Sequence, residues 1–362
     1  MAPAGLLGRL IDFYSKQPEV PPVLSVQSAS LLSVGFPRPE GGRDPFDHSA
    51  HPSMLRLLVT LVYVAPLYLS PATRPSPSLS RDAPSVIQAR VRVVTTSCVG
   101  TTIVMLVLMI RNAHTSAAEA LRLLGWWPIQ IVDVLRSLLL LLLLFAGPLF
   151  ERGIAQGGWR TWLKGHDLVQ SLRGWLGWRN YVVGPVSEEI IFRSVIISLH
   201  LLAKMSATRI VFLSPLYFGI AHVHHCYEFH LTHPDTPVST ALLTSVFQFG
   251  YTTVFGWWAA FLYLRTGSLL AVTLAHSFCN WCGLPRLWGR IEPAVQIRPP
   301  LSVRSKEDAP GVRILSNGGQ LGIAWTVTYY VLLVAGTVAF YSLLWPLTHS
   351  NRALASFDAT PT

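Results

Sequence analysis

The segment GPVSEEIIFRSVII, residues 184–197, places two adjacent glutamates and an arginine inside an otherwise apolar run. A charge at the centre of a membrane-spanning helix costs about 2.5–3.5 kcal/mol on insertion scales, so three charges here need compensation. Glu189 and Arg193 are four residues apart with the glutamate first, a spacing that lets them pair on one helix face. Glu188 is rotated by about 100° from Glu189 and has no such partner. A purely structural ion-pair cluster between helices accounts for Glu189 and Arg193, but not for Glu188.

The composition indicates a membrane protein. Of the 362 residues, 51% are hydrophobic and only 13% are charged, whereas soluble domains carry about 25% charged residues. The net charge is +10. The basic residues fall mostly between apolar runs, as expected for loops on the cytosolic side of a membrane. No nucleic-acid-binding motif accompanies the charge, so we predict no nucleic-acid partner.

We predict an all-α polytopic membrane protein with about eight transmembrane helices that enclose an intramembrane catalytic cavity. The candidate spans are residues 54–70, 91–110, 129–150, 181–203, 209–226, 240–264, 268–284 and 323–346. They form a multi-pass membrane domain over 54–346, which contains a long polar loop at 285–322. Residues 1–53 are predicted to be a poorly ordered N-terminal tail, and residues 347–362 a C-terminal tail.

Further polar side chains fall inside the predicted spans. Phe218 and His222 are four residues apart and His225 follows, while His276 and Asn280 share a face of a later span. The lysine and arginine bias places the loops at 71–90, 151–180 and 285–322 in the cytosol. Successive spans then run in alternating directions, which brings Glu188, His222, His276 and Asn280 to a similar depth. We therefore predict a shared cavity that opens to the cytosol.

These residue types favour hydrolysis of an acyl bond inside the membrane. A glutamate and a histidine can hold and deprotonate a water molecule, and a second histidine and an asparagine can donate hydrogen bonds to an oxyanion. Neither H-E-x-x-H nor G-x-S-x-G occurs in the sequence. A metal bound by Glu188, His222, His225 and His276 stays open, as does Cys279 of the Cys279-x-x-Cys282 pair as a nucleophile. The main alternative is a non-catalytic membrane scaffold or transporter with a buried Glu/His/Arg cluster.

The motifs E-E-x-x-x-R, F-x-x-x-H and H-x-x-x-N, in this order on successive spans, resemble those of the type II CAAX prenyl endopeptidases, or Ras-converting enzymes, within the glutamate-type intramembrane proteases. The strings at 81–91, 179–194, 215–225 and 247–285 look like the eukaryotic members. The resemblance covers about residues 54–346. The tail 1–50 and the length of the loop 286–322 depart from the expected pattern.

The resemblance implies a role for each matching residue. Glu188 would be the principal catalytic acid and base, and His222 would help to hold and activate water. His276 and Asn280 would form the oxyanion hole. The supporting residues would be Glu189, Arg193, Phe218 and His225. The resemblance implies no cofactor and no bound metal.

The implied reaction is removal of the last three residues from prenylated CAAX proteins. The expected partners are Ras- and Rho-like GTPases, a prenylated pheromone and the lipids of the endoplasmic reticulum membrane, with the active site open to the cytosol. A lipidated C-terminus would explain the membrane setting, because the prenyl chain can stay in lipid while the peptide enters from the cytosol. A related enzyme that cleaves a different membrane peptide remains a second alternative.

Overall fold

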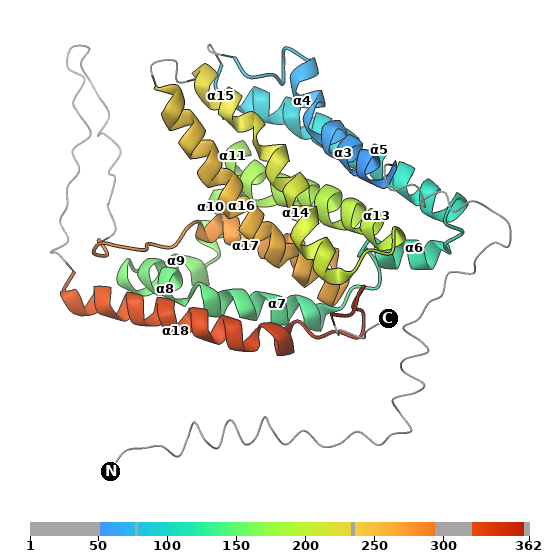
Figure 1. Cartoon of the computed structure of the whole chain (residues 1–362). Helices are drawn as coiled ribbons and strands as arrows, with labels where there is room; N and C mark the ends of the chain where they lie inside the picture. The colour runs from blue at the N-terminus through green and yellow to red at the C-terminus, as the bar shows by residue number, and fades with distance from the viewer. Residues whose placement is uncertain (1–50, 77–78, 233–235, 294–320, 358–362) are drawn as a thin grey trace, which may run out of the picture. The chain divides into compact units, whose positions relative to one another are not determined.

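The computed structural model describes residues 51–76, 79–232, 236–293 and 321–357, and every regular element among them is a helix (Figure 1). Residues 1–50 of the predicted tail 1–53 and most of the predicted loop 285–322 lie outside the described residues. Residues 51–53, predicted to belong to the poorly ordered tail, are instead the first residues of a helix. The all-α prediction is therefore confirmed for the part of the chain that the structure describes.

Each of the eight predicted apolar segments coincides with a helix or a continuous helical run. These are α3 (His51–Val64) with α4 (Pro66–Leu69), α5 (Pro84–Arg111), α7 (Ile131–Leu144) with α8 (Ala146–Leu149) and η1 (Phe150–Ala155), the run η2 (Arg179–Val183), α12 (Gly184–Glu189), η3 (Ile190–Val195) and α13 (Ile196–Leu202), then α14 (Ala207–His222), α16 (Val238–Thr266), α17 (Leu269–Cys282) and α18 (Ile323–Leu347). The remaining helices are α6 (Ala117–Leu123), α9 (Trp159–Leu163), α10 (His166–Arg173), α11 (Trp175–Trp178) and α15 (His224–Thr232).

Within the part of the chain that the structure describes, two helices, α5 and α18, are long and apolar enough to cross a membrane by length and composition. A third span is added if α7 and the following 146–155 segment, which are bent by 77°, form one broken span. The outward-facing side chains are apolar, with Ile103 of α5 55% exposed and Val334 of α18 63% exposed. Such faces suit lipid contact. The number of eight spans stays a prediction.

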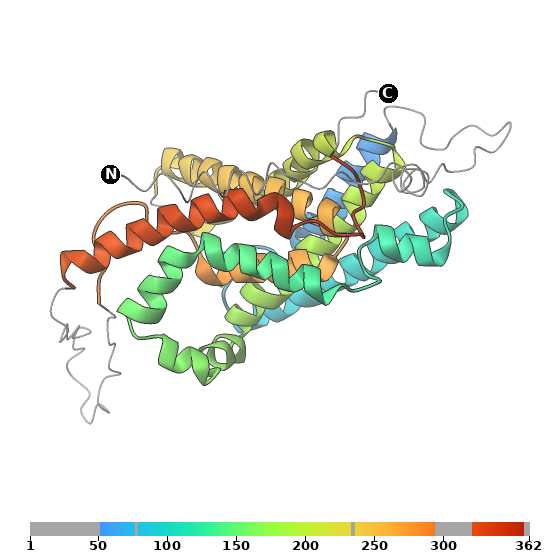
Figure 2. The same cartoon turned by 90° about the horizontal axis from the view of Figure 1, so that it is seen from below.

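The helices are arranged around the run that contains α12 and α13. Figure 1 places this run with α14, α16 and α17 between the α3–α5 group on one side and the pair α7 and α18 on the other. The contacts agree, because α14 packs against α16 and α3, and α7 packs against α17 and α18. Figure 2 also shows α18 alongside α7. Gly336 permits this approach, since a Cβ at that position would collide with the Leu143 carbonyl oxygen.

The predicted span 209–226 ends earlier than expected. Helix α14 stops at His222, and α15 begins at His224 after a turn at Val223. The break is stabilised by the histidines themselves. His222 Nδ1 donates to the Phe218 carbonyl at 2.7 Å, and His224 Nδ1 donates to the Ala221 carbonyl at 2.6 Å. Ring nitrogens thus satisfy carbonyl groups near a helix end, where intrahelical donors run out.

Candidate active site

The two adjacent glutamates occupy different environments because neighbouring residues on a helix point in different directions. Glu189 is fully buried and pairs with Arg193, whose Nη1 lies 3.0 Å from Glu189 Oε1. The pairing expected from their spacing is thus present. Glu188 instead lines a cavity of about 970 Å³. The π-helical segments η2 and η3 flank α12 on both sides, and such segments occur frequently at functional sites.

His276 lies beside both glutamates. Its Nδ1 is 2.7 Å from Glu189 Oε1, and its Nε2 is 3.7 Å from Glu188 Oε2. The first distance is a strong hydrogen bond, while the second is an ionic contact too long for one. A carboxylate only accepts, so His276 Nδ1 carries a proton. The sequence had left Glu188 without a partner and had not linked His276 to Glu189, because the two residues lie 87 positions apart.

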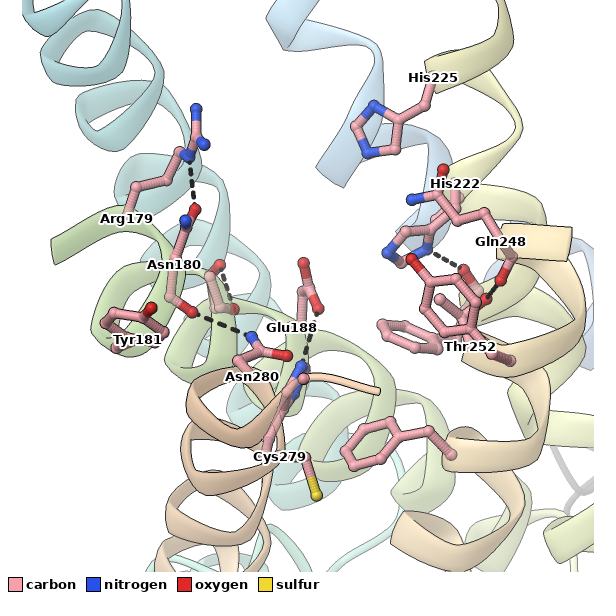
Figure 3. A pocket seen from close by; sticks show the side chains of 18 of the residues that line it. Arg179, Asn180, Tyr181, Glu188, His222, His225, Gln248, Thr252, Cys279 and Asn280 are labelled. Carbon is pink, nitrogen blue, oxygen red and sulfur yellow. Dashed lines mark hydrogen bonds and ion pairs between the residues drawn. The ribbon is translucent and has the colours of Figure 1, made fainter. Parts of the chain in front are cut away.

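His222 presents a free ring nitrogen to the same cavity. Its Nδ1 must donate in the bond to the Phe218 carbonyl, since a carbonyl can only accept. Nε2 of the neutral ring is therefore an acceptor, available to a water molecule. Figure 3 shows Glu188 between His222 on one side and Asn280 on the other. The structure thus gathers Glu188, His222, His276 and Asn280 on the wall of one cavity.

Two aromatic rings hold the buried arginine. The Arg193 guanidinium carbon lies 4.6 Å from the centre of the Phe218 ring and 5.5 Å from that of Phe255. Arg193 Nη2 is buried and has no hydrogen-bond acceptor among the described residues. The π faces therefore supply part of its stabilisation. Phe255 also lies 4.6 Å from the His276 ring. Sequence reasoning missed Phe255, because an aromatic residue in an apolar helix has the pattern of an ordinary core residue.

Asn280 is fixed by a residue that the sequence did not single out. Its Nδ2 donates to the Asn180 carbonyl at 3.0 Å, and the Asn180 side-chain oxygen accepts from Arg179 Nε at 2.9 Å. Figure 3 shows this chain of contacts at one side of the cavity. The amide of Asn280 carries two N–H donors, and the bond to Asn180 uses one of them. The only signal in the sequence was that Arg179 and Asn180 open the string at 179–194.

His225 belongs to a second group of side chains rather than to the Glu188 pair. Its Nδ1 lies 2.9 Å from Glu228 Oε2, and Glu228 also binds Arg90 Nη2 at 2.6 Å and Arg81 Nη1 at 3.2 Å. Burial opposes ionisation of Glu228, but the hydrogen bond from His225 and the charge of Arg90 lower the pKa of Glu228 to about 2. Glu228 is therefore a carboxylate at neutral pH.

The metal set considered from the sequence does not converge within the described residues. The group of three possible ligands there is His224, His225 and Glu228, whose ligand atoms lie within 4.8 Å of one another. Glu228 already faces two guanidinium groups, which oppose a further cation. Cys279 lines the cavity, but no described basic side chain forms a hydrogen bond with its thiol, and His276 Nδ1 is bonded to Glu189.

The helical fold with apolar outer faces and a cavity lined by a glutamate, two histidines and an asparagine are the features expected of a membrane-bound hydrolase. Residues 170–282 match the family described as type II CAAX prenyl endopeptidase Rce1-like, a range that includes all four cavity residues. The chain is 36% identical to the probable CAAX prenyl protease 2 of Schizosaccharomyces pombe over 299 residues, which are 83% of this chain and 94% of that protein.

Two further relatives carry the same name. CAAX prenyl protease 2 of Homo sapiens is 33% identical over 66% of this chain and 72% of that protein. The Saccharomyces cerevisiae protein is 26% identical over 80% of this chain and 94% of its own length. No solved structure gives a significant match. The chain belongs to the type II CAAX prenyl endopeptidase family, and it is accordingly a protease.

Proposed function

We propose that this protease removes the C-terminal tripeptide from prenylated CAAX proteins, using a water molecule activated by Glu188 and His222. The observation that carries the proposal is the position of these two side chains on the wall of one cavity, with His222 Nε2 available as an acceptor. The names of the relatives, CAAX prenyl proteases, support the substrate class.

In the proposed mechanism, a water molecule lies between Glu188 and His222. His222 Nε2 accepts one hydrogen bond and orients the water, while the Glu188 carboxylate removes a proton as the oxygen attacks the carbonyl carbon of the prenylated cysteine. The resulting tetrahedral intermediate carries a negative oxygen. Its collapse breaks the C–N bond, and Glu188 returns the proton to the nitrogen of the leaving tripeptide.

Asn280 and His276 are proposed to stabilise the negative oxygen. The second N–H of Asn280 is one donor. His276 can donate from Nε2 only as an imidazolium, because its Nδ1 proton is already bonded to Glu189. His276 Nε2 lies 3.7 Å from Glu188 Oε2, so this nitrogen is beside the proposed catalytic carboxylate.

We propose that residues 54–346 form the protease domain, with eight spans in the endoplasmic reticulum membrane and the cavity open to the cytosol. The bias of lysine and arginine toward loops on one side supports this orientation. The exposed apolar helix faces would contact lipid, where the prenyl chain of the substrate can remain. Ras- and Rho-like GTPases and a prenylated pheromone are the proposed substrates.

The test is cleavage of a farnesylated CAAX peptide by membranes that contain the chain. Tripeptide release is compared for the wild type, Glu188→Ala, His222→Ala and the wild type treated with a chelator. Glu292→Ala serves as the control, because Glu292 is exposed and does not line the cavity.

We expect release by the wild type and the control, loss by about 100-fold or more in the two cavity variants, and no effect of the chelator. Chelator inhibition that zinc reverses would contradict the metal-free mechanism. Full activity of Glu188→Ala would contradict the role of Glu188. A folded wild type without activity on any prenylated peptide would favour the scaffold or transporter alternative.

A further inference from the structure

Three arginines that the proposed mechanism does not use line the cavity, namely Arg81, Arg90 and Arg179, which we call the arginine cluster. Their carboxylate partners are Glu228 and Asp82. Glu228 binds Arg81 and Arg90, and Asp82 lies 2.8 Å from Arg179 Nη1. Neither carboxylate lines the cavity. The three arginines of the cluster therefore border the cavity, and their two carboxylate partners do not.

The charges of this group do not cancel. Among the ion pairs of the described residues, the three guanidinium groups face two carboxylates, which is an excess of one positive charge. The cations are also well held: Arg90 Nε donates to the Thr73 carbonyl at 2.8 Å, and Arg179 Nε donates to the Asn180 side chain at 2.9 Å. Positively charged N–H donors that are held in place in a partly buried cavity can bind a carboxylate or another oxyanion.

The arginine cluster is joined directly to the proposed catalytic residues. Asn180 accepts from Arg179 through its side chain and from Asn280 through its carbonyl oxygen. Arg179 and Glu188 belong to one continuous helical run, along which they are separated by a rise of about 13 Å. An extended tripeptide spans up to about 10 Å, so the side chain of Arg179 can cover the remainder. In Figure 3, Arg179 and His225 lie toward one end of the cavity and Cys279 toward the other.

We propose that the arginine cluster binds the C-terminal carboxylate of the substrate, three residues beyond the bond that is cut. This inference rests on the proposed function, because a CAAX substrate ends in a free carboxylate at that distance. Anchoring the chain end on the cluster places the third peptide bond from the C-terminus beside Glu188. The distance between the cluster and Glu188 would then determine that the leaving group is a tripeptide.

The test pairs two substrates with three variants. The substrates are one farnesylated CAAX peptide with a free C-terminal carboxylate and the same peptide with a C-terminal amide. The variants are Arg81→Gln, Arg179→Gln and the control Arg92→Gln. Arg92 lies two residues from Arg90 on α5 but is exposed and does not line the cavity. The values kcat and KM are measured for each combination.

For the wild type and Arg92→Gln we expect kcat/KM to favour the carboxylate peptide by about ten- to a hundredfold, the effect of a hydrogen bond to a charged group. The preference is expected mainly in KM. In Arg81→Gln and Arg179→Gln the ratio of kcat/KM for the carboxylate peptide to that for the amide peptide should fall toward one. Arg179→Gln also removes the contact to Asn180, which holds Asn280, so it lowers cleavage of both peptides and only the ratio is read for this variant. Retained amide cleavage by Arg81→Gln also shows that this variant folds.

Equal cleavage of both peptides by the wild type would overturn the inference, and so would an unchanged preference in both cluster variants. These results leave the proposed function intact, because cleavage still occurs. Failure of the wild type on both peptides would instead contradict the proposed function itself. The two failures are therefore distinguishable in one experiment.

Discussion

Substitution of Glu189 is expected to lower the stability of the protein, whereas substitution of Glu188 is expected to lower its activity. Glu189→Ala removes the carboxylate 3.0 Å from Arg193, which is 2% exposed. At an effective dielectric constant of about 20, the attraction lost is roughly 5 kcal/mol, in line with the approximately 3–5 kcal/mol measured when one partner of a buried pair is removed. His276 also loses its acceptor, at a cost of about 1–3 kcal/mol. The Phe218 and Phe255 rings retain about 2 kcal/mol of cation–π attraction to Arg193.

The net expectation for Glu189→Ala is a loss of about 4 kcal/mol in the free energy of unfolding, and a fall in Tm of about 5 °C for a chain of 362 residues. Glu188→Gln is nearly isosteric and faces the cavity, so its stability should change by less than about 1 kcal/mol, while tripeptide release falls about 10²- to 10⁴-fold. Thermal unfolding of the purified protein in detergent and peptide cleavage separate the two effects.

A double variant provides the matched control. Glu189→Gln with Arg193→Met removes both charges and keeps an amide oxygen for His276, so most of the lost stability should return. The reasoning would be refuted if Glu189→Ala unfolded at the wild-type temperature. It would also be refuted if Glu188→Gln lowered Tm as much as Glu189→Ala does.

Three further predictions concern single positions. Asn280→Ala should lower kcat about 10²- to 10³-fold with little change in KM, as for other oxyanion donors, and steady-state kinetics will check it. Gly336→Leu should disrupt the packing of α18 on α7, because a side chain there meets the Leu143 carbonyl; a loss of folded protein in size-exclusion chromatography is the expected result. Phe255→Leu removes one of the two rings over Arg193 and should cost about 1 kcal/mol, which thermal unfolding can measure.

Much of the site follows from local spacing. The pair of Glu189 and Arg193 could be predicted because residues four apart on a helix share a face, whatever surrounds that helix. The separate position of Glu188 follows from the same rotation of about 100° per residue. The break after His222 could not be predicted in this way. It depends on histidine rings that bond to nearby carbonyl groups once the helix has formed.

The sequence by itself determined the helices, their apolar faces and the set of polar residues that the membrane must accommodate, because these depend on periodicity and composition along the chain. Only the tertiary structure decided which polar groups meet. His276 forms a hydrogen bond with Glu189, a contact that its spacing from Asn280 did not indicate. Arg81 and Arg90 form ion pairs with Glu228, which is about 140 positions away in the sequence. Such contacts are set by helix packing, and spacing along one helix carries no information about the neighbour that its side chains will face.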